Sequence, residues 1–261
     1  MELNYRQYGD GAIPLIILHG LFGLSDNWAG YGNLLGADYT VYIPDLRNHG
    51  FSPHDPIMRY EAMASDLEEF METHAIVNPL LMGHSMGGKV VLQFVKDFPH
   101  ALRAALVLDI SPVRYHLRQV HLDMATLMQS MDMGIYASRR EILEVVRGAI
   151  QGERLQQFVM KNLYRSGQNT FGWKPNVDAI LASLEDISAA IEPPEAVPSV
   201  PVKFIRGGES DYVTPEDEEI IQKYWSDQKV ESIPHASHWI HVDAPEPLLR
   251  AIKKFFASCC G

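Results

Sequence analysis

The chain has 261 residues, 46% of them apolar, which is enough for one large domain or for a domain with an insertion. Its formal net charge of −11 at pH 7 argues against nucleic acid or an anionic membrane as a main partner, because both repel an acidic surface. These properties favour a small-molecule ligand.

The cysteines and the N-terminal residues bear on the cellular compartment. Cys259 and Cys260 are adjacent, which is unlike the spaced cysteines of a secreted disulfide framework. Residues 1–12 lack a basic stretch followed by an apolar one, and no apolar run approaches the roughly 18 residues of a membrane-spanning helix. We therefore expect a cytoplasmic protein that does not bind membranes.

Short apolar runs recur along the chain, and such runs are typical of strands buried on both faces of a sheet. Between several of them, apolar residues are spaced for one face of a helix, as in residues 60–71 and 90–98. This alternation predicts an α/β fold with a mostly parallel sheet. The predicted strands are Pro14–Leu18, Thr40–Ile43, Leu80–Met82, Ala104–Leu108, Val202–Ile205 and Val230–Ile233.

The alternation stops between Pro112 and about Pro198, where helical spacing dominates and no convincing strand occurs. Ser138 and Glu141 have the spacing of a capping box at the start of one such helix. The interruption predicts a helical cap inserted into an α/β domain. The expected boundaries are residues 1–111 and 199–261 for the core domain, and 112–198 for the cap.

The segment Gly83-His84-Ser85-Met86-Gly87 directly follows one predicted strand and precedes a predicted helix. In an open parallel sheet, chemistry takes place at the carboxyl ends of the strands. The glycines allow a sharp turn that projects the serine side chain, so Ser85 is a candidate nucleophile and the Met86 amide a candidate oxyanion donor. The alternative is a polar residue in a tight turn. The nucleophile interpretation requires an acid and then a histidine later in the chain, whereas the turn interpretation requires neither.

A serine hydroxyl is a weak nucleophile until an imidazole takes its proton. His238 lies in a loop between the last predicted strand and a final amphipathic helix, and it is the predicted base. His235 and His241 are nearby rivals. His241 also forms an H-x-x-H pair with His238, but no carboxylate or thiolate cluster accompanies it. We therefore expect neither a metal nor a cofactor.

An oxyanion hole needs a second amide, and the turn after the first strong strand offers one. The segment is His19-Gly20-Leu21-Phe22-Gly23, whose glycines let the backbone bend toward the nucleophile. The N–H of Leu21 is the predicted second donor, and His19 is expected to be structural.

Several motifs together resemble the α/β-hydrolase superfamily over nearly the whole chain, and specifically the YbfF-type esterases. The motifs are LHGLFGLSDNW, PDLRNHGFSPHD, GHSMGGKV, LDISPV and SHWIHVDAPE. The resemblance implies an eight-stranded sheet, helices on both faces and a helical lid after the sixth strand. It also implies hydrolysis of carboxylic esters or acyl thioesters by a Ser-His-Asp triad through an acyl-enzyme intermediate.

The triad acid has two candidate positions. Many members of the superfamily carry it in a G-x-x-D loop after the seventh strand, and here counting from Gly207 reaches Ser210, whereas counting from Gly208 reaches Asp211. Asp109, at the end of the strand before the cap, resembles the arrangement of the YbfF-type esterases. We favour Asp109 and retain Asp211 as the alternative.

Substrate contacts are expected from both the core and the cap. Met124, Leu127, Met128 and Met131 share one helical face, and part of this face is predicted to line an apolar acyl pocket. The alternative is packing within the cap, because methionine commonly fills irregular gaps in a core. The expected substrate-binding residues are Phe22, His84, Met124 and Met128.

Other functions remain compatible with parts of this pattern. A haloalkane dehalogenase or an epoxide hydrolase is disfavoured because those enzymes need a carboxylate nucleophile, and position 85 is serine. A carbon–carbon bond hydrolase or a cofactor-free haloperoxidase would use the same triad. A non-catalytic small-molecule-binding module is the third alternative, since fold alone does not determine function.

Overall fold

A computed structural model describes residues 1–116, 118–167 and 170–260 of the chain. A seven-stranded sheet in the order β1-β3-β2-β4-β5-β8-β9 lies at its centre, parallel except for β1, which runs antiparallel to β3. The prediction of a mostly parallel α/β fold is therefore confirmed. The strands are β1 (Tyr5–Tyr8), β2 (Pro14–Leu18), β3 (Thr40–Pro44), β4 (Leu80–His84), β5 (Ala104–Leu108), β8 (Val202–Gly207) and β9 (Glu231–Ile233).

Two hydrophobic cores lie on opposite faces of this sheet. Along β2, Ile16 and Leu18 belong to one core, whereas Leu15 and Ile17 belong to the other, because successive strand side chains point to opposite faces. Helices α2 (Tyr60–Thr73), α3 (Met86–Asp97) and α9 (Pro215–Tyr224) cover the first core, and α1 (Ala29–Leu35) and α11 (Pro245–Ser258) cover the second. Burial on both faces explains why the central strands are continuous apolar runs.

The expectation of eight strands is wrong for the part of the chain that the structure describes, which forms seven in this sheet. The cap accordingly follows β5, the fifth strand along the chain, and not a sixth. Strand β1 was missed because it is a four-residue edge strand whose Arg6 and Gln7 are exposed, so it has no apolar run.

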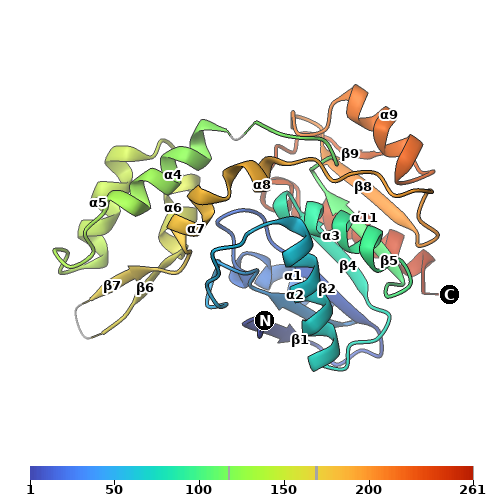
Figure 1. Cartoon of the computed structure of the whole chain (residues 1–261), viewed down its shortest axis with the longest axis horizontal. Coiled ribbons are helices and arrows are strands. Elements are labelled where there is room, and N and C mark those ends of the chain that lie inside the picture. Colours follow the sequence, from blue (N-terminus) through green and yellow to red (C-terminus); the bar gives the residue numbers. More distant parts are fainter. Residues whose placement is uncertain (117, 168–169, 261) are drawn as a thin grey trace.

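In its described residues, the segment between β5 and β8 holds five helices and one pair of antiparallel strands, and Figure 1 shows this segment extending to one side of the core. Its two three-residue strands correct the expectation that no strand occurs here, and they are too short to give a hydrophobic pattern. Ser138 accepts the N–H of Glu141 at the start of α5, as predicted. The elements are α4 (Gln119–Ser130), α5 (Arg139–Ala149), α6 (Glu153–Lys161), β6 (Leu163–Arg165), β7 (Phe171–Trp173), α7 (Val177–Ala182) and α8 (Leu184–Ser188).

The two chain crossings between the core and this segment are tied together and to α3. The N–H of Ile191 donates to the carbonyl of Pro112 at 2.7 Å. The buried Nζ of Lys89 donates to the carbonyls of Val113 at 2.7 Å and Ala189 at 2.5 Å. Since α3 starts directly after Ser85, one helix bears on both the turn at Ser85 and the two chain crossings.

No helix in the described ranges combines the length and the hydropathy needed to cross a membrane.

Candidate active site

Ser85 occupies the turn between β4 and α3 with φ 54° and ψ −122°, a conformation that strains any residue other than glycine. Its glycine neighbours leave no room for side chains. A Cβ on Gly83 would lie 2.2 Å from the carbonyl oxygen of Gly87, and a Cβ on Gly87 would lie 2.6 Å from that of Leu18. The close packing of α3 on β4 thus forces a sharp turn at the carboxyl end of the strand.

His238, in the loop between β9 and the short helix α10 (Ile240–Asp243), contacts Ser85 and Asp109 at the same time. Its Nε2 lies 3.0 Å from Ser85 Oγ, and its Nδ1 lies 2.7 Å from Asp109 Oδ2. The fold therefore brings together the three residues that the sequence suggested as nucleophile, base and acid, from loops more than 20 residues apart.

Asp109 is fully buried directly after β5, and both of its carboxylate oxygens are engaged. Oδ1 accepts the N–H of Gly207 at 2.8 Å, and Oδ2 accepts the hydroxyl of Ser210 at 2.5 Å as well as the His238 ring. Ser210 is the residue reached by one register of the G-x-x-D count, but sequence reasoning assigned it no role. The bonds to Gly207 and Ser210 fix the Asp109 carboxylate, which follows β5, against the end of the adjacent strand β8.

Asp211, the alternative acid, accepts a hydrogen bond from the Nη2 of Arg118 at 2.6 Å, and its side chain is 75% exposed. That bond holds the pKa of Asp211 below its ordinary value. The structure thus pairs this carboxylate with a guanidinium, whereas the contact to His238 is made by Asp109.

Tyr212 was missed by the sequence reasoning, because nothing local indicates what a loop tyrosine contacts. Its ring stacks on His238 with centroids 3.6 Å apart and an interplanar angle of 12°. The guanidinium of Arg118 covers the opposite face of Tyr212, 4.0 Å from the ring centroid. His84 adds a hydrogen bond from Nε2 to the His238 carbonyl oxygen at 2.8 Å. Both the ring and the backbone of His238 are therefore held in place.

The rival histidines contact other residues. The side chain of His235 is 92% exposed, with Nδ1 3.5 Å from Glu209. His241 stacks on Trp28 at 4.7 Å. Within residues 1–116, 118–167 and 170–260, no group of His, Cys, Asp and Glu side chains is arranged to hold a metal ion.

The amides expected to form an oxyanion hole are available. The N–H of Phe22 donates to Nε2 of His49 at 3.0 Å, and that of Gly23 closes the turn at the Gly20 carbonyl. Among the described hydrogen bonds, none uses the N–H of Leu21 or Met86. The Met86 amide also lies at the N-terminus of α3, where the helix dipole favours negative charge.

Ser85 borders two cavities. The wide cavity, of about 280 Å³, is lined by Ser85, His238 and a largely apolar wall from the core and the cap. The narrow cavity, of about 40 Å³, lies against Ser85, Leu21 and Met86. The apolar wall of the wide cavity comprises Leu21, which borders both cavities, and Trp28, Val120, Met124, Leu155, Phe158 and Trp239.

The four expected substrate-binding residues divide into two pairs. His84 and Met124 line the wide cavity. Phe22 and Met128 lie outside the described lining of both cavities and are buried in the hydrophobic core. The methionine face of α4 therefore contributes one residue, Met124, to the cavity wall, and its other members are buried in the hydrophobic core.

Comparison with known proteins bears on the chemistry of this site. Residues 15–251 match the alpha/beta hydrolase family. The chain is therefore an alpha/beta hydrolase. This hydrolase is 31% identical over 261 residues to Esterase YbfF of Escherichia coli (strain K12), covering 98% of this chain and 99% of that protein. It is also 33% identical to the sn-1-specific diacylglycerol lipase ABHD11 of Danio rerio, covering 98% of this chain and 82% of that protein.

Among solved structures, a marine microorganism esterase is similar to the alpha/beta hydrolase with a TM-score of 0.94 and 35% sequence identity, covering 97% of this chain and 99% of that chain. The expected membership among YbfF-type esterases is confirmed, and the hydrolase is of the carboxylesterase type.

Five histidines, three of them buried and two partly buried, give the hydrolase an expected pH dependence of stability. Burial lowers their pKa values below the ordinary 6.5, so the folded chain keeps these rings neutral where the unfolded chain protonates them. Their stabilisation is present above pH 6.5 and is lost as the pH falls through the lower folded values. They are His19, His49 (pKa about 3), His84, His121 (pKa about 4) and His241 (pKa about 4).

We expect the free energy of unfolding, measured by urea titration at pH 7.5, 6.0 and 5.0, to decrease with falling pH. Each histidine contributes a slope of up to about 1.4 kcal/mol per pH unit. A free energy of unfolding that stays constant from pH 6.5 to 5.0 would show that these rings take up protons equally in the folded and the unfolded chain, and would contradict the lowered pKa values.

Proposed function

We propose that this hydrolase cleaves carboxylic esters and acyl thioesters through an acyl-enzyme intermediate on Ser85. The observation that carries the proposal is the hydrogen-bonded series Asp109, His238 and Ser85, with contacts of 2.7 and 3.0 Å, in the wall of an apolar cavity. The proposed division is a core of residues 1–111 and 199–261 and a cap of residues 112–198.

In the proposed acylation step, Ser85 Oγ attacks the substrate carbonyl carbon while His238 Nε2 takes the hydroxyl proton. The carbonyl oxygen becomes an oxyanion that the N–H groups of Leu21 and Met86 stabilise. Asp109 keeps the His238 Nδ1 proton in place and stabilises the imidazolium. When the tetrahedral intermediate collapses, Nε2 donates its proton to the leaving oxygen or sulfur, and the alcohol or thiol departs.

Deacylation repeats the same steps with water. His238 removes a proton from a water molecule that attacks the acyl carbon, and the second tetrahedral intermediate expels Ser85 Oγ, which recovers a proton from Nε2. The carboxylic acid is the second product. Because each step uses only side chains and amides that border Ser85, the proposal requires no cofactor.

The alternatives rest on weaker grounds. A carbon–carbon bond hydrolase or a cofactor-free haloperoxidase would use the same three side chains, but the similar proteins reported above are named for ester hydrolysis. A binding module would not need the complete hydrogen-bonded series. The acidic net charge and the free thiols of Cys259 and Cys260 support our inference of a cytoplasmic enzyme that acts on small molecules.

The proposal is tested by labelling the purified protein with a fluorophosphonate and by assaying matched oxyester and thioester substrates of one acyl group. We expect labelling at Ser85 in one-to-one stoichiometry and turnover of both substrates. Heat-denatured protein is the control, because an isolated serine hydroxyl does not react. A native protein that neither reacts with the probe nor hydrolyses any ester would support the binding-module alternative.

A further inference from the structure

The two cavities that meet at Ser85 share Leu21, Arg118, His121 and Tyr212, but they differ in two neighbours that bear on the reaction. His238 belongs to the described lining of the wide cavity and not to that of the narrow one. Met86, which carries one of the two proposed oxyanion amides, borders the narrow cavity and not the wide one, whereas Leu21, which carries the other, borders both. The imidazole of His238 therefore faces the wide cavity, on one side of Ser85, and does not face the narrow cavity on the other.

This arrangement assigns a direction to each part of an ester. The leaving oxygen has to receive its proton from His238 Nε2, so the leaving group extends into the wide cavity. The carbonyl oxygen points at the amides of Leu21 and Met86. The remaining substituent of the tetrahedral carbon, the acyl chain, is then directed into the narrow cavity.

The volumes limit what each cavity accepts. A cavity needs on the order of 10–15 Å³ to hold one water-sized group. The narrow cavity of about 40 Å³ therefore has room for roughly three such groups. The wide cavity of about 280 Å³ is sevenfold larger, and aromatic and aliphatic side chains line most of it.

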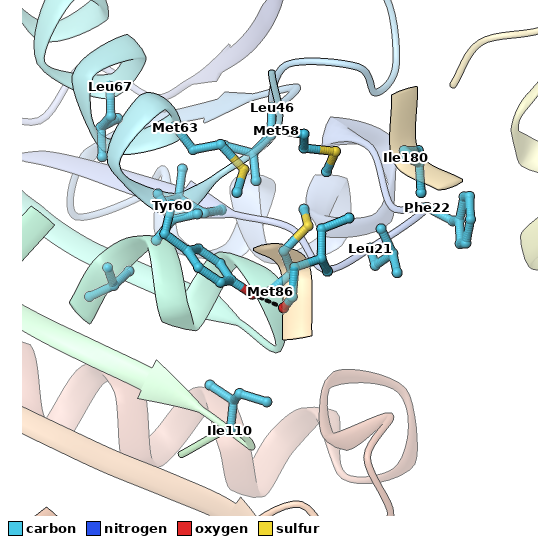
Figure 2. Close-up of a cluster of buried hydrophobic side chains, with 14 of the residues drawn as sticks. Leu21, Phe22, Leu46, Met58, Tyr60, Met63, Leu67, Met86, Ile110 and Ile180 are labelled. Carbon is cyan, nitrogen blue, oxygen red and sulfur yellow. Dashed lines mark hydrogen bonds between the residues drawn. The ribbon is translucent and has the colours of Figure 1, made fainter. Parts of the chain in front are cut away.

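Hydrogen bonds brace the wall of the narrow cavity. The hydroxyl of Tyr60 donates to the carbonyl of Ile187 at 2.7 Å, and Lys89 holds Val113 and Ala189. Figure 2 shows four residues that line this cavity: Tyr60 of α2, Met86 of α3, and Leu21 and Ile110 of the loops after β2 and β5. Since these bonds link the core to both cap crossings, the wall resists being widened by a longer acyl chain.

We propose that this hydrolase is selective for short acyl groups, of about two to four carbons, carried on bulky apolar alcohols or thiols. The narrow cavity is the acyl site and the wide cavity, including Met124, is the leaving-group site. This inference rests on the proposed function, and it reverses the sequence-based expectation that Met124 lines an acyl pocket.

Two substrate series test the assignment. In p-nitrophenyl esters with acyl chains of two to ten carbons, we expect kcat/KM to fall about tenfold or more for each methylene that overfills the cavity. In acetate esters of alcohols from methanol to octanol, we expect kcat/KM to rise by up to about fourfold per methylene, the gain of burying one CH₂ group.

Paired cavity variants separate the two sites. Ile187→Ala enlarges the narrow cavity and keeps the Tyr60 hydrogen bond, because that bond uses the Ile187 backbone. We expect this variant to shift the acyl optimum to longer chains and to leave the alcohol series unchanged. Met124→Ala, the matched control in the wide cavity, is expected to change the alcohol series alone. Fluorophosphonate labelling verifies that each variant is folded, and Ile187→Val replaces the alanine variant if that one does not fold.

The outcomes distinguish this inference from the proposed function. Preference for long acyl chains on small alcohols, or an acyl optimum that moves with Met124→Ala, would overturn the assignment of the cavities and leave ester hydrolysis intact. A protein that hydrolyses no ester and does not react with the fluorophosphonate would refute the proposed function itself.

Discussion

Replacing Ser85 by alanine is expected to abolish ester hydrolysis and to leave the fold intact. Removing such a nucleophile costs on the order of 10⁶ in turnover, because the remaining groups only bind and polarise the substrate. The substitution deletes one hydroxyl in the cavity wall. It introduces no steric clash, because alanine is smaller than serine, and it leaves the strained backbone φ of 54° unchanged. Turnover of p-nitrophenyl acetate and the thermal midpoint measure the two expectations.

A second serine provides the control for this experiment. Ser226 is buried and donates to the carbonyl of Val202 at 2.5 Å, and it lies outside the described lining of both cavities. We expect Ser226→Ala to lower stability by about 1 kcal/mol and to keep its turnover. If Ser85→Ala retained more than a small fraction of the parent activity, a different nucleophile would have to be sought.

Replacing Asp109 by asparagine is expected to lower turnover by up to ~10⁴, and replacing Asp211 by asparagine is expected to have little effect. Asparagine at position 109 presents an amide to His238 Nδ1 and favours the wrong imidazole tautomer, so Nε2 no longer accepts the Ser85 proton. Asp211→Asn removes only an exposed ion pair with Arg118, and such pairs contribute about 0–1 kcal/mol.

The two asparagine variants serve as controls for each other, because the chemical change is identical and the two residues follow adjacent strands, β5 and β8. The measurement is kcat for a short-chain ester at a pH where the parent is fully active, with circular dichroism to compare the folds. A crippled Asp211→Asn enzyme beside a nearly normal Asp109→Asn enzyme would mean that the acid follows β8 and not β5.

The sequence was informative wherever structure depends on near neighbours. Strand β2 was predicted because Leu15 to Leu18 form an unbroken apolar run, and the start of α5 because Ser138 and Glu141 have the spacing of a capping box, where Ser138 does accept the N–H of Glu141. These signals are local, since the side-chain periods of strands and helices act over a few residues. Elements without such a signal, namely β1 and the β6–β7 hairpin, were missed.

The sequence by itself determined the α/β class, the tight turn at Ser85 and the set of candidate acids and bases, because residue spacing encodes local geometry. The tertiary structure alone decided that His238 contacts Asp109 and not Asp211, that Tyr212 stacks on His238, and that Ser85 separates a wide cavity from a narrow one. The physical reason is that these features join side chains far apart in the sequence, such as Ser85 and His238, which are 153 residues apart. How closely such side chains approach each other is set by the packing of the strands and the cap helices.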